Sequence, residues 1–297
     1  MTQSCGLVAI LGAPNAGKST LVNALVGQKV AITSPKAQTT RTRLMGIAIH
    51  GDTQLLLLDT PGIFVPGRRL DRAMVKAAWD GAEDADRLVL MIDASTGLGK
   101  RDEMLLEGAE RRPEPKILVL NKVDLTKKHK LLELAQPLSD RLQPEAVFFT
   151  DALRGEGVAE LKQHLADAMP EGPWHFPEDQ LSDATDRMIA AELTREQLYA
   201  QLHQELPYAS TVVTEKWEDR PDGSTAIHQQ IRIARDSQKG IVLGKGGARL
   251  KAIGETARGE IADYLGRQVH LFLHVKVDPK WDEDREVYDE VGLDWKV

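Results

Sequence analysis

Cysteine is scarce in this sequence, and long apolar runs are missing. The single cysteine, Cys5, excludes an internal disulfide framework and is typical of a reducing compartment. Apolar runs such as LLLL at 55–58 and LVLMI at 88–92 are far too short to cross a bilayer, so we expect no transmembrane segment. Since the N-terminus lacks a basic segment followed by an apolar one, we also expect no signal peptide.

An excess of basic charge is missing as well. The net charge of -7 argues against attraction of nucleic acid or membrane over the whole surface, so any nucleic-acid site must be a local patch. With 297 residues, 42% of them hydrophobic and 28% charged, the composition is that of a soluble globular chain long enough for two domains.

A phosphate-binding loop is present near the N-terminus. An apolar run at 7–11 predicts a strand, and STLVNALV at 19–26 predicts a helix that stops at Gly27. Between them stands GAPNAGKS, the Walker A pattern in its required context. Its glycines let backbone N–H groups surround a phosphate, Lys18 is expected to reach the β- and γ-phosphates, and the Ser19 hydroxyl is expected to ligate Mg²⁺.

A second motif reads the base. The buried-type strand at 117–120 ends in Asn121, Lys122, Val123 and Asp124. A carboxylate at this place can accept two hydrogen bonds from guanine, whereas adenine offers no such pair, and a buried polar group left unpaired rejects the wrong ligand by about 10⁴-fold. Together with the first loop, NKVD predicts GTP rather than ATP.

The stretch LLLLDTPG predicts the third part of the site. Asp59 ends a strand and is expected to hold Mg²⁺ through water, and the Gly62 N–H is expected to sense the γ-phosphate. The motifs in this order resemble the translation-factor-related GTPases over residues 6–165. By analogy with that group, Thr40 rather than Thr39 ligates Mg²⁺, 30–43 is a loop ordered by the γ-phosphate, and 62–71 is a second mobile segment.

Two positions depart from that group. Ile63 follows DTPG where many small GTPases have a glutamine that orients the attacking water, and isoleucine cannot hydrogen-bond. In resembling bacterial GTPases with a hydrophobic residue here, K⁺ serves as a catalytic cation held partly by an asparagine, which is Asn15 in this chain; alternatively, Asn15 simply suits the backbone of the loop. Asp151 replaces the serine of the last guanine motif, while Ala152 still offers its N–H to guanine O6.

The resulting set of candidate residues has three roles. Lys18, Asn15, Thr40 and Gly62 are the catalytic candidates, and Ser19, Thr40 and Asp59 are the metal candidates. The expected nucleotide-binding residues are Gly12, Asn15, Ala16, Gly17, Lys18, Ser19, Thr20, Asp59, Thr60, Pro61, Gly62, Asn121, Lys122, Asp124, Asp151, Ala152 and Leu153.

The chain changes character after residue 169. Three prolines within 169–183 interrupt any helix or sheet and indicate a linker. Beyond it the patterns predict helix 185–206, strands 208–219 and 225–235 joined by a turn, helices 236–243 and 248–266, and strand 269–277. We expect the acidic tail, 281–297, to be helical.

A second glycine-lysine loop, GKGG at 244–247, lies between the two predicted helices. Counted from Gly240, the stretch GIVLGK has one residue too few for Walker A, and Gly246 stands where a metal-binding hydroxyl is needed. GKGG fits the GXXG loop of a KH domain, which clamps the backbone of about four single-stranded nucleotides. The surrounding stretch is basic. The expected RNA-binding residues are Arg232, Arg235, Lys239, Gly244, Lys245, Gly246, Gly247, Arg249 and Lys251.

Taken together, GAPNAGKSTLVNALVG, KAQTTRTR, DTPGI, NKVD, FPEDQLSD, AAELTREQLY, ELPY and GIVLGKGGARLKAIG resemble the Era family of bacterial GTPases over essentially the whole chain. The resemblance implies an α/β P-loop GTPase domain at 1–170, a linker at 171–183 and an α+β type II KH domain with a C-terminal helix at 184–297. It also implies GTP/GDP and Mg²⁺ as ligands and slow hydrolysis. The implied partners are the 16S rRNA 3′ region and the 30S subunit. The implied setting is a monomer in the cytoplasm, with weak peripheral association with the inner membrane.

Competing functions stay open at this point. The chain is either a timing switch that releases RNA on hydrolysis or an RNA-binding assembly chaperone in which hydrolysis is secondary. A tRNA-modification GTPase is disfavoured because that family has a catalytic cysteine at the C-terminus, and Cys5 lies at the other end. A membrane-signalling GTPase is disfavoured because there is no lipid-attachment cysteine near the C-terminus.

Overall fold

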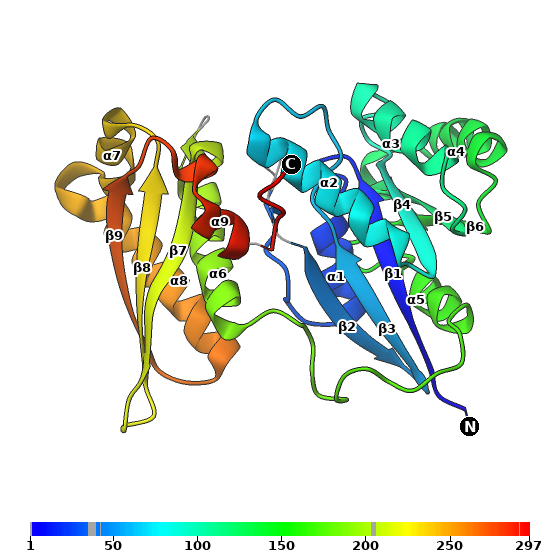
Figure 1. Ribbon diagram of the computed structural model, residues 1–297. Coiled ribbons are helices and arrows are strands. Elements are labelled where there is room, and N and C mark those ends of the chain that lie inside the picture. Colours follow the sequence, from blue (N-terminus) through cyan, green and yellow to red (C-terminus); the bar gives the residue numbers. More distant parts are fainter. Residues whose placement is uncertain (1, 35–39, 42, 203–205, 291) are drawn as a thin grey trace. The chain divides into compact units, whose positions relative to one another are not determined.

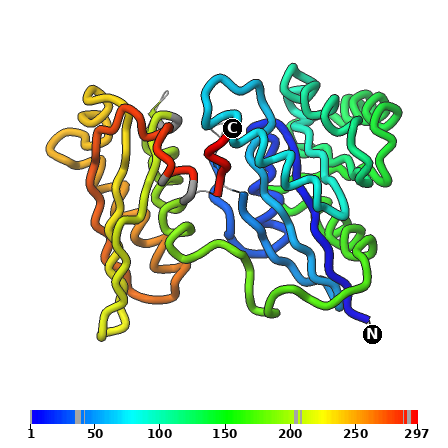
Figure 2. The backbone as a smooth tube through the Cα atoms, in the orientation of Figure 1, coloured from blue at the N-terminus to red at the C-terminus, as the bar shows by residue number. Residues whose placement is uncertain are grey.

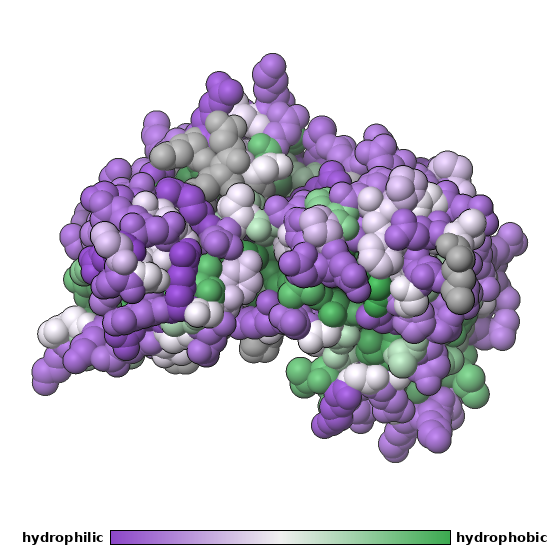
Figure 3. All heavy atoms as spheres, turned by 90° about the horizontal axis from the view of Figure 1, so that it is seen from below, coloured by the Kyte–Doolittle hydropathy of each residue, from purple (hydrophilic) through white to green (hydrophobic). Residues whose placement is uncertain are grey.

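The computed structural model describes residues 2–34, 40–41, 43–202, 206–290 and 292–297. Two compact units divide the chain between Asp183 and Ala184, and each is described by itself. Polar residues cover most of the face drawn in Figure 3, and hydrophobic residues lie there in smaller groups. In the described part, every helix is too short or too polar to span a bilayer.

The first unit is a sheet with helices on both faces (Figure 1). Its strands are β1 (Ser4–Gly12), β2 (Leu44–His50), β3 (Thr53–Asp59), β4 (Arg87–Asp93), β5 (Lys116–Asn121) and β6 (Ala146–Thr150). They lie in the order β2-β3-β1-β4-β5-β6, and all neighbours are parallel except β2 with β3. The order reverses at β1, and ligands of such sheets bind beyond the carboxyl ends of the strands at this point.

The helices of this unit fall into two groups. They are α1 (Lys18–Val26), α2 (Arg69–Glu83), α3 (Lys100–Glu110), α4 (Lys128–Leu142) and α5 (Val158–Asp167). Apolar side chains of α2, α3 and α4 form one core with one face of β1, β3, β4 and β5, whereas α1 and α5 contact each other and β3. The strands carry long apolar runs because both faces of the sheet are covered.

The predicted linker, 171–183, lies with the first unit. Its backbone bonds to the sheet at two places: Gly172 N–H donates to Gln3 O, just before the interior strand β1, and Ile47 N–H, on the edge strand β2, donates to Leu181 O. The side chain of Gln54 also bonds to the backbone of Phe176. Figure 2 follows this segment, in green, past β2 and β3. A proline-rich segment that cannot form a helix is therefore tied to the sheet through side chains and single backbone bonds.

The second unit is a three-stranded sheet with two long helices. The strands β7 (Ser210–Asp219), β8 (Thr225–Ile233) and β9 (Val269–Val277) lie in this order, β7 antiparallel and β9 parallel to β8. Helices α6 (Asp186–Gln201) and α8 (Ala248–Leu265) contact each other, while α7 (Asp236–Leu243) precedes α8. The observed order, α6, β7, β8, α7, α8, β9, confirms the predicted order of elements, and helix 185–206 is observed over 186–201, with 203–205 outside the described residues.

The acidic tail is less helical than expected. A 3₁₀ turn at Trp281–Glu283 precedes α9 (Arg285–Glu290), and 292–297 is not helical. Two aromatic side chains anchor the tail. Trp281 and Tyr288 are fully buried, and the Trp281 indole donates to Ala209 O at 3.2 Å. Since Gly292 has a φ of 64°, the helical path does not continue through it.

Candidate functional site

The first loop turns between β1 and α1 and is fastened to β5. Gly17 has a φ of 103°, which glycine adopts without strain. The amide of Asn121 donates to Ala16 O at 2.8 Å, and a Cβ on Gly17 would lie 2.4 Å from Asn121 Nδ2. The glycine is therefore needed both for its backbone angle and for the close approach of Asn121.

A cavity of about 1030 Å³ opens at this loop, large enough for a nucleoside triphosphate. Sequence-predicted members line it, among them Asn15, Lys18, Ser19, Thr40 and Gly62 at the phosphate end. At the opposite end it is lined by Asn121, Lys122, Asp124, Asp151 and Leu153. The structure thus brings the two predicted halves of the site, which lie far apart in sequence, to one cavity.

Three oxygen side chains meet beside the loop. Ser19 Oγ donates to Asp59 Oδ2 at 2.6 Å, Thr40 Oγ1 donates to the same oxygen at 3.2 Å, and the two hydroxyls lie 2.8 Å apart. One carboxylate and two hydroxyls make a set of hard oxygen ligands, which fits Mg²⁺ with phosphate and water completing the shell. Thr39, the alternative to Thr40, lies outside the described residues, as does much of the expected loop 30–43.

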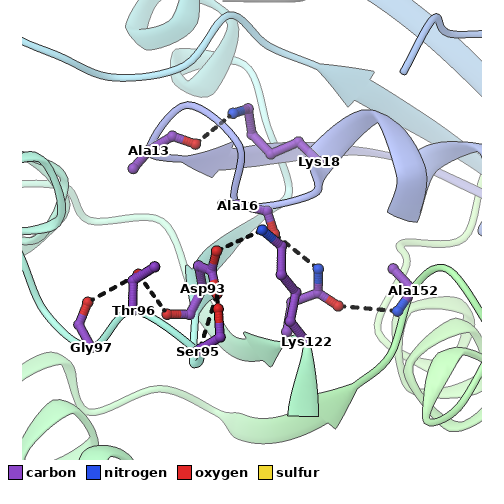
Figure 4. Close-up of polar contacts among 10 residues, drawn as sticks. Ala13, Ala16, Lys18, Asp93, Ser95, Thr96, Gly97, Lys122 and Ala152 are labelled. Atoms are coloured by element: carbon purple, nitrogen blue, oxygen red, sulfur yellow. Dashed lines mark hydrogen bonds and ion pairs between the residues drawn. The ribbon is translucent and has the colours of Figure 1, made fainter. Parts of the chain in front are cut away.

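Lys18 is buried at the floor of the phosphate end. Its ammonium donates to Gly12 O at 3.2 Å and to Ala13 O at 3.1 Å, and Figure 4 shows the second contact. Burial lowers the pKa of Lys18 to about 8, although the nearby Asp59 opposes the change. An anion in the cavity would favour the charged form of this lysine.

The segment after Asp59 packs closely against the loop. Ile63 N–H donates to Gly12 O at 3.0 Å, and a Cβ on Gly62 would lie 2.8 Å from Pro14 N. Thr60, expected to bind nucleotide, instead donates its hydroxyl to Ile10 O at 2.7 Å and is buried. Ile63 is fully buried in the core, so its side chain does not face the cavity at all.

Asn121 joins three segments at the base end. Its Nδ2 donates to Ala16 O at 2.8 Å, and its Oδ1 accepts from Ala152 N–H at 3.0 Å (Figure 4). The same Oδ1 accepts from Thr150 Oγ1 at 3.0 Å. The Ala152 N–H was expected to face guanine O6. In the structure it is directed at Asn121 instead, because the side chain of Asn121 fills the space between β5 and the β6 loop.

Asp93 is a cavity residue that sequence reasoning missed. It ends β4, its Oδ2 accepts from Lys122 Nζ at 2.6 Å, and its Oδ1 accepts from Ser95 N–H at 3.0 Å (Figure 4). Ile32–Ser34 and Gly99–Asp102 also line the cavity. The available signal for Asp93 was its position: like Asp59 and Asn121, it is the polar residue at the carboxyl end of a buried parallel strand.

The second glycine-lysine loop connects α7 to α8. Gly244, Gly246 and Gly247 have φ values of 69°, 60° and 81°. A Cβ on Gly244 would lie 2.8 Å from Arg249 Cβ, so the loop also needs glycine for space. Lys245 is exposed in this turn, as are Arg235, Lys239 and Lys251, while Arg249 is half-buried and donates to Ile241 O at 3.2 Å.

Arg232 is the exception among the predicted RNA-binding residues. It lies on the central strand β8, is 5% exposed, and pairs with Asp284 at 2.8 Å and with Gln230 Oε1 at 2.7 Å. A guanidinium that is buried and occupied in this way holds the tail to the sheet. The stretch of basic residues therefore does not form one continuous surface, and we remove Arg232 from the RNA-binding set.

Comparisons with known proteins match both units. The model of a 50S ribosome-binding GTPase family matches residues 7–122, and the KH domain model matches residues 205–282. The chain is 63% identical to GTPase Era of Erythrobacter litoralis, covering 98% of this chain and 97% of the relative. It is 55% identical to GTPase Era of Afipia carboxidovorans, covering 98% and 94%.

Two solved structures match over 98% of this chain and 99% of their own. One is Era in complex with MgGDPNP and nucleotides 1506–1542 of 16S ribosomal RNA, with a TM-score of 0.92 and 37% identity. The other is a single-residue variant of Aquifex aeolicus Era bound to GDP·AlF4⁻, with the same TM-score and identity. The likeness therefore extends through both units.

Proposed function

Because the chain belongs to the Era family of GTPases, we propose that it is a GTP-driven switch that binds 16S rRNA near its 3′ end through its KH unit and assists assembly of the small ribosomal subunit. The observation that carries the proposal is the presence of two phosphate-binding loops of different geometry in one chain. One closes over a cavity, and the other is an exposed turn between two helices.

The first loop and the residues beside it would act by holding positive charge and hydrogen-bond donors close to the phosphates. In hydrolysis, a water oxygen attacks the γ-phosphorus while the bond to the β–γ bridging oxygen breaks. Lys18 and the backbone N–H groups of the loop, in which Pro14 has none, stabilise the negative charge on the phosphate oxygens. Ser19, Thr40 and Asp59 would hold Mg²⁺, which neutralises charge on the β- and γ-phosphates when bound.

The residue after DTPG does not position the attacking water. Ile63 is buried, so it supplies neither a hydrogen bond nor a charge to the attacking water. Slow intrinsic turnover follows. We propose that K⁺ near Asn15 stimulates the reaction; Asn15 lines the cavity, and its φ of 69° also fits the simpler role of a residue that suits the loop's backbone. Turnover in K⁺ compared with Na⁺, in the natural chain and in Asn15→Ala, separates the two roles.

The GKGG turn would bind RNA by letting the sugar-phosphate backbone approach the protein backbone closely. The glycines of the GKGG turn leave room for a sugar-phosphate chain, Lys245 supplies exposed charge, and the N-terminus of α8 follows directly. Such a clamp suits single-stranded RNA. The bases that it reads would be set by the surrounding side chains.

The first test compares RNA affinity in two nucleotide states. A short single-stranded RNA from the 16S 3′ end is titrated against the full chain with a non-hydrolysable GTP analogue and then with GDP. Tighter binding with the analogue supports the switch. Equal affinity removes RNA binding as the output of the switch and favours the assembly chaperone, since a ligand that does not distinguish two states cannot shift them.

The setting of the protein is proposed on the family resemblance. We place it in the cytoplasm as a monomer, with weak peripheral association with the inner membrane, and we retain 1–170, 171–183 and 184–297 as its functional parts. Sedimentation of the full chain tests the monomer, and co-sedimentation with anionic vesicles tests the membrane association.

A further inference from the structure

Two carboxylates lie together at the base end of the cavity. Asp151 stands where resembling GTPases have serine, and it is only 4% exposed. Its Oδ1 accepts from Leu153 N–H and Arg154 N–H, both at 3.1 Å, which fixes the turn after β6. Its other oxygen, Oδ2, accepts from the side chain of Arg154 at 3.0 Å.

A single arginine nitrogen bridges the two acids. Arg154 Nη1 donates to Asp124 Oδ2 at 2.8 Å and to Asp151 Oδ2 at 3.0 Å. Both oxygens are therefore held against one cation. Removing the arginine would take away the cation that both carboxylates contact, and nearby like charges repel.

We propose that Arg154 is a positioning residue for guanine recognition: it holds the Asp124 carboxylate in place and compensates the negative charge that Asp151 introduces. The inference rests on the proposed function, because it takes Asp124 as the residue that reads the base. Arg154 does not touch the nucleotide in this account. It acts through Asp124.

The geometry leaves Asp124 able to bind the base. Each carboxylate oxygen has about two acceptor sites. Oδ2 can therefore keep its bond from Arg154 and still accept from guanine, and Oδ1 can accept the second guanine bond. The Arg154 side chain is 68% exposed, so its effect comes from orientation and local charge, and a moderate effect is expected.

The test is a ratio of affinities for two nucleotides that differ by one group. Inosine diphosphate lacks the exocyclic amine of GDP but keeps N1–H, so a correctly oriented carboxylate makes two bonds to GDP and one to inosine diphosphate. For Arg154→Ala we expect GDP affinity to fall about fivefold and inosine diphosphate affinity by less than about twofold. An unchanged ratio, with both affinities lowered equally, would mean that Arg154 only supports the loop and would overturn the proposal.

A double-mutant cycle tests the compensation of charge. Asp151→Ser removes the second acid and supplies a hydroxyl. In that background the Arg154–Asp124 contact remains but there is no second acid to compensate, so Arg154→Ala should change the GDP-to-inosine-diphosphate ratio by less than it does with Asp151, and the two substitutions should be non-additive. If Arg154→Ala costs the same with Asp151 and with serine, Asp151 is not what makes the arginine necessary.

Two controls keep the outcomes distinct. Arg141 also bridges two carboxylates, Glu103 and Glu110, and none of the three lines the cavity, so Arg141→Ala should leave the ratio unchanged. Asp124→Asn should exchange the guanine preference for xanthine, whose 2-oxo group can accept from the amide. If Asp124→Asn keeps the guanine preference, the proposed base site fails; if it switches while Arg154→Ala leaves the ratio unchanged, only the role of Arg154 fails.

Discussion

The two glycine-lysine loops contain the same residue types in different structural surroundings. In the first, β1 and α1 enclose the turn, Asn121 reaches in from β5, and Lys18 is buried with a lowered pKa. In the second, three positive-φ glycines stand between two helices, and Lys245 remains exposed. A small ligand that must be surrounded needs a cavity built by distant strands, whereas a long polymer needs an open turn that it can cross.

The largest expected effect is at the enclosed lysine. Lys18→Ala should lower GTP turnover by about 10³-fold, because a charge aimed at the phosphates is lost where few other groups can replace it. Single-turnover hydrolysis with saturating GTP measures this. Lys162→Ala is the matched control, since burial lowers the pKa of Lys162 as well but this lysine does not line the cavity. Normal turnover in Lys18→Ala would contradict the site.

The glycine of the enclosed loop should also be indispensable. In Gly17→Ala the new methyl would meet Asn121 Nδ2 at 2.4 Å, so the bond that fastens the loop must break. We expect GDP affinity to fall about 100-fold, or roughly 2.7 kcal/mol. Gly27→Ala has a similar backbone cost, with a φ of 86° and no atom within 4 Å, and its GDP affinity should stay near the natural value. Equal effects would assign the loss to backbone strain alone.

Arg232 differs from Lys245 because its charge is paired with Asp284 inside the second unit, so its loss should affect stability and not RNA binding. Arg232→Ala removes the pair with Asp284 and should destabilise the second unit by about 2 kcal/mol. Faster hydrogen exchange of β8 and β9 amides would report it. The salt dependence of RNA binding should keep its slope, and a decrease in that slope would return Arg232 to the RNA surface.

Loss of the Lys245 charge should have the reverse effect, weaker RNA binding with unchanged stability. Lys245→Glu should weaken RNA binding about tenfold and leave GTP affinity and amide exchange unchanged, because the side chain is exposed in the turn. Lys245→Ala should lower the salt slope by about 0.7. Lys216→Glu, an equal charge change on β7, is the control. If GTP and RNA affinity fell together in Lys245→Glu, the division into two separate sites would be wrong.

The smallest effect concerns pH at the enclosed loop. With a pKa of about 8, Lys18 in the free protein loses its proton as the pH rises through 8, so GDP affinity should fall by at most about tenfold per pH unit above that value. The unfolded chain keeps this proton up to its ordinary pKa of 10.5, so this group makes folding more favourable with rising pH between 8 and 10.5. GDP titrations at pH 7 to 9 should show the decline in the natural chain and lose it in Lys18→Ala.

Local motifs account for most of what could be predicted. The order of elements in the second unit followed from periodicity and turns, and its one clear failure was the tail, where burial of Trp281 and Tyr288 rather than helical pattern decides the path. In the first unit the motif strands were predictable because each is a buried run ending in a polar residue. Asp93 also ends a buried apolar run, but it is not part of a sequence motif, so it was not predicted.

The sequence by itself determined the two loops, the preference for guanine and the likeness to a GTPase joined to a KH domain. These depend on short contiguous patterns, in which spacing and glycine fix the backbone directly. Tertiary structure alone decided that the Ala152 N–H turns to Asn121, that Arg232 is buried against Asp284, and that Arg154 reaches Asp124 as well as its near neighbour Asp151. Each of these pairs residues brought together only by the packing of separate elements, and no local spacing encodes which side chain will fill that space.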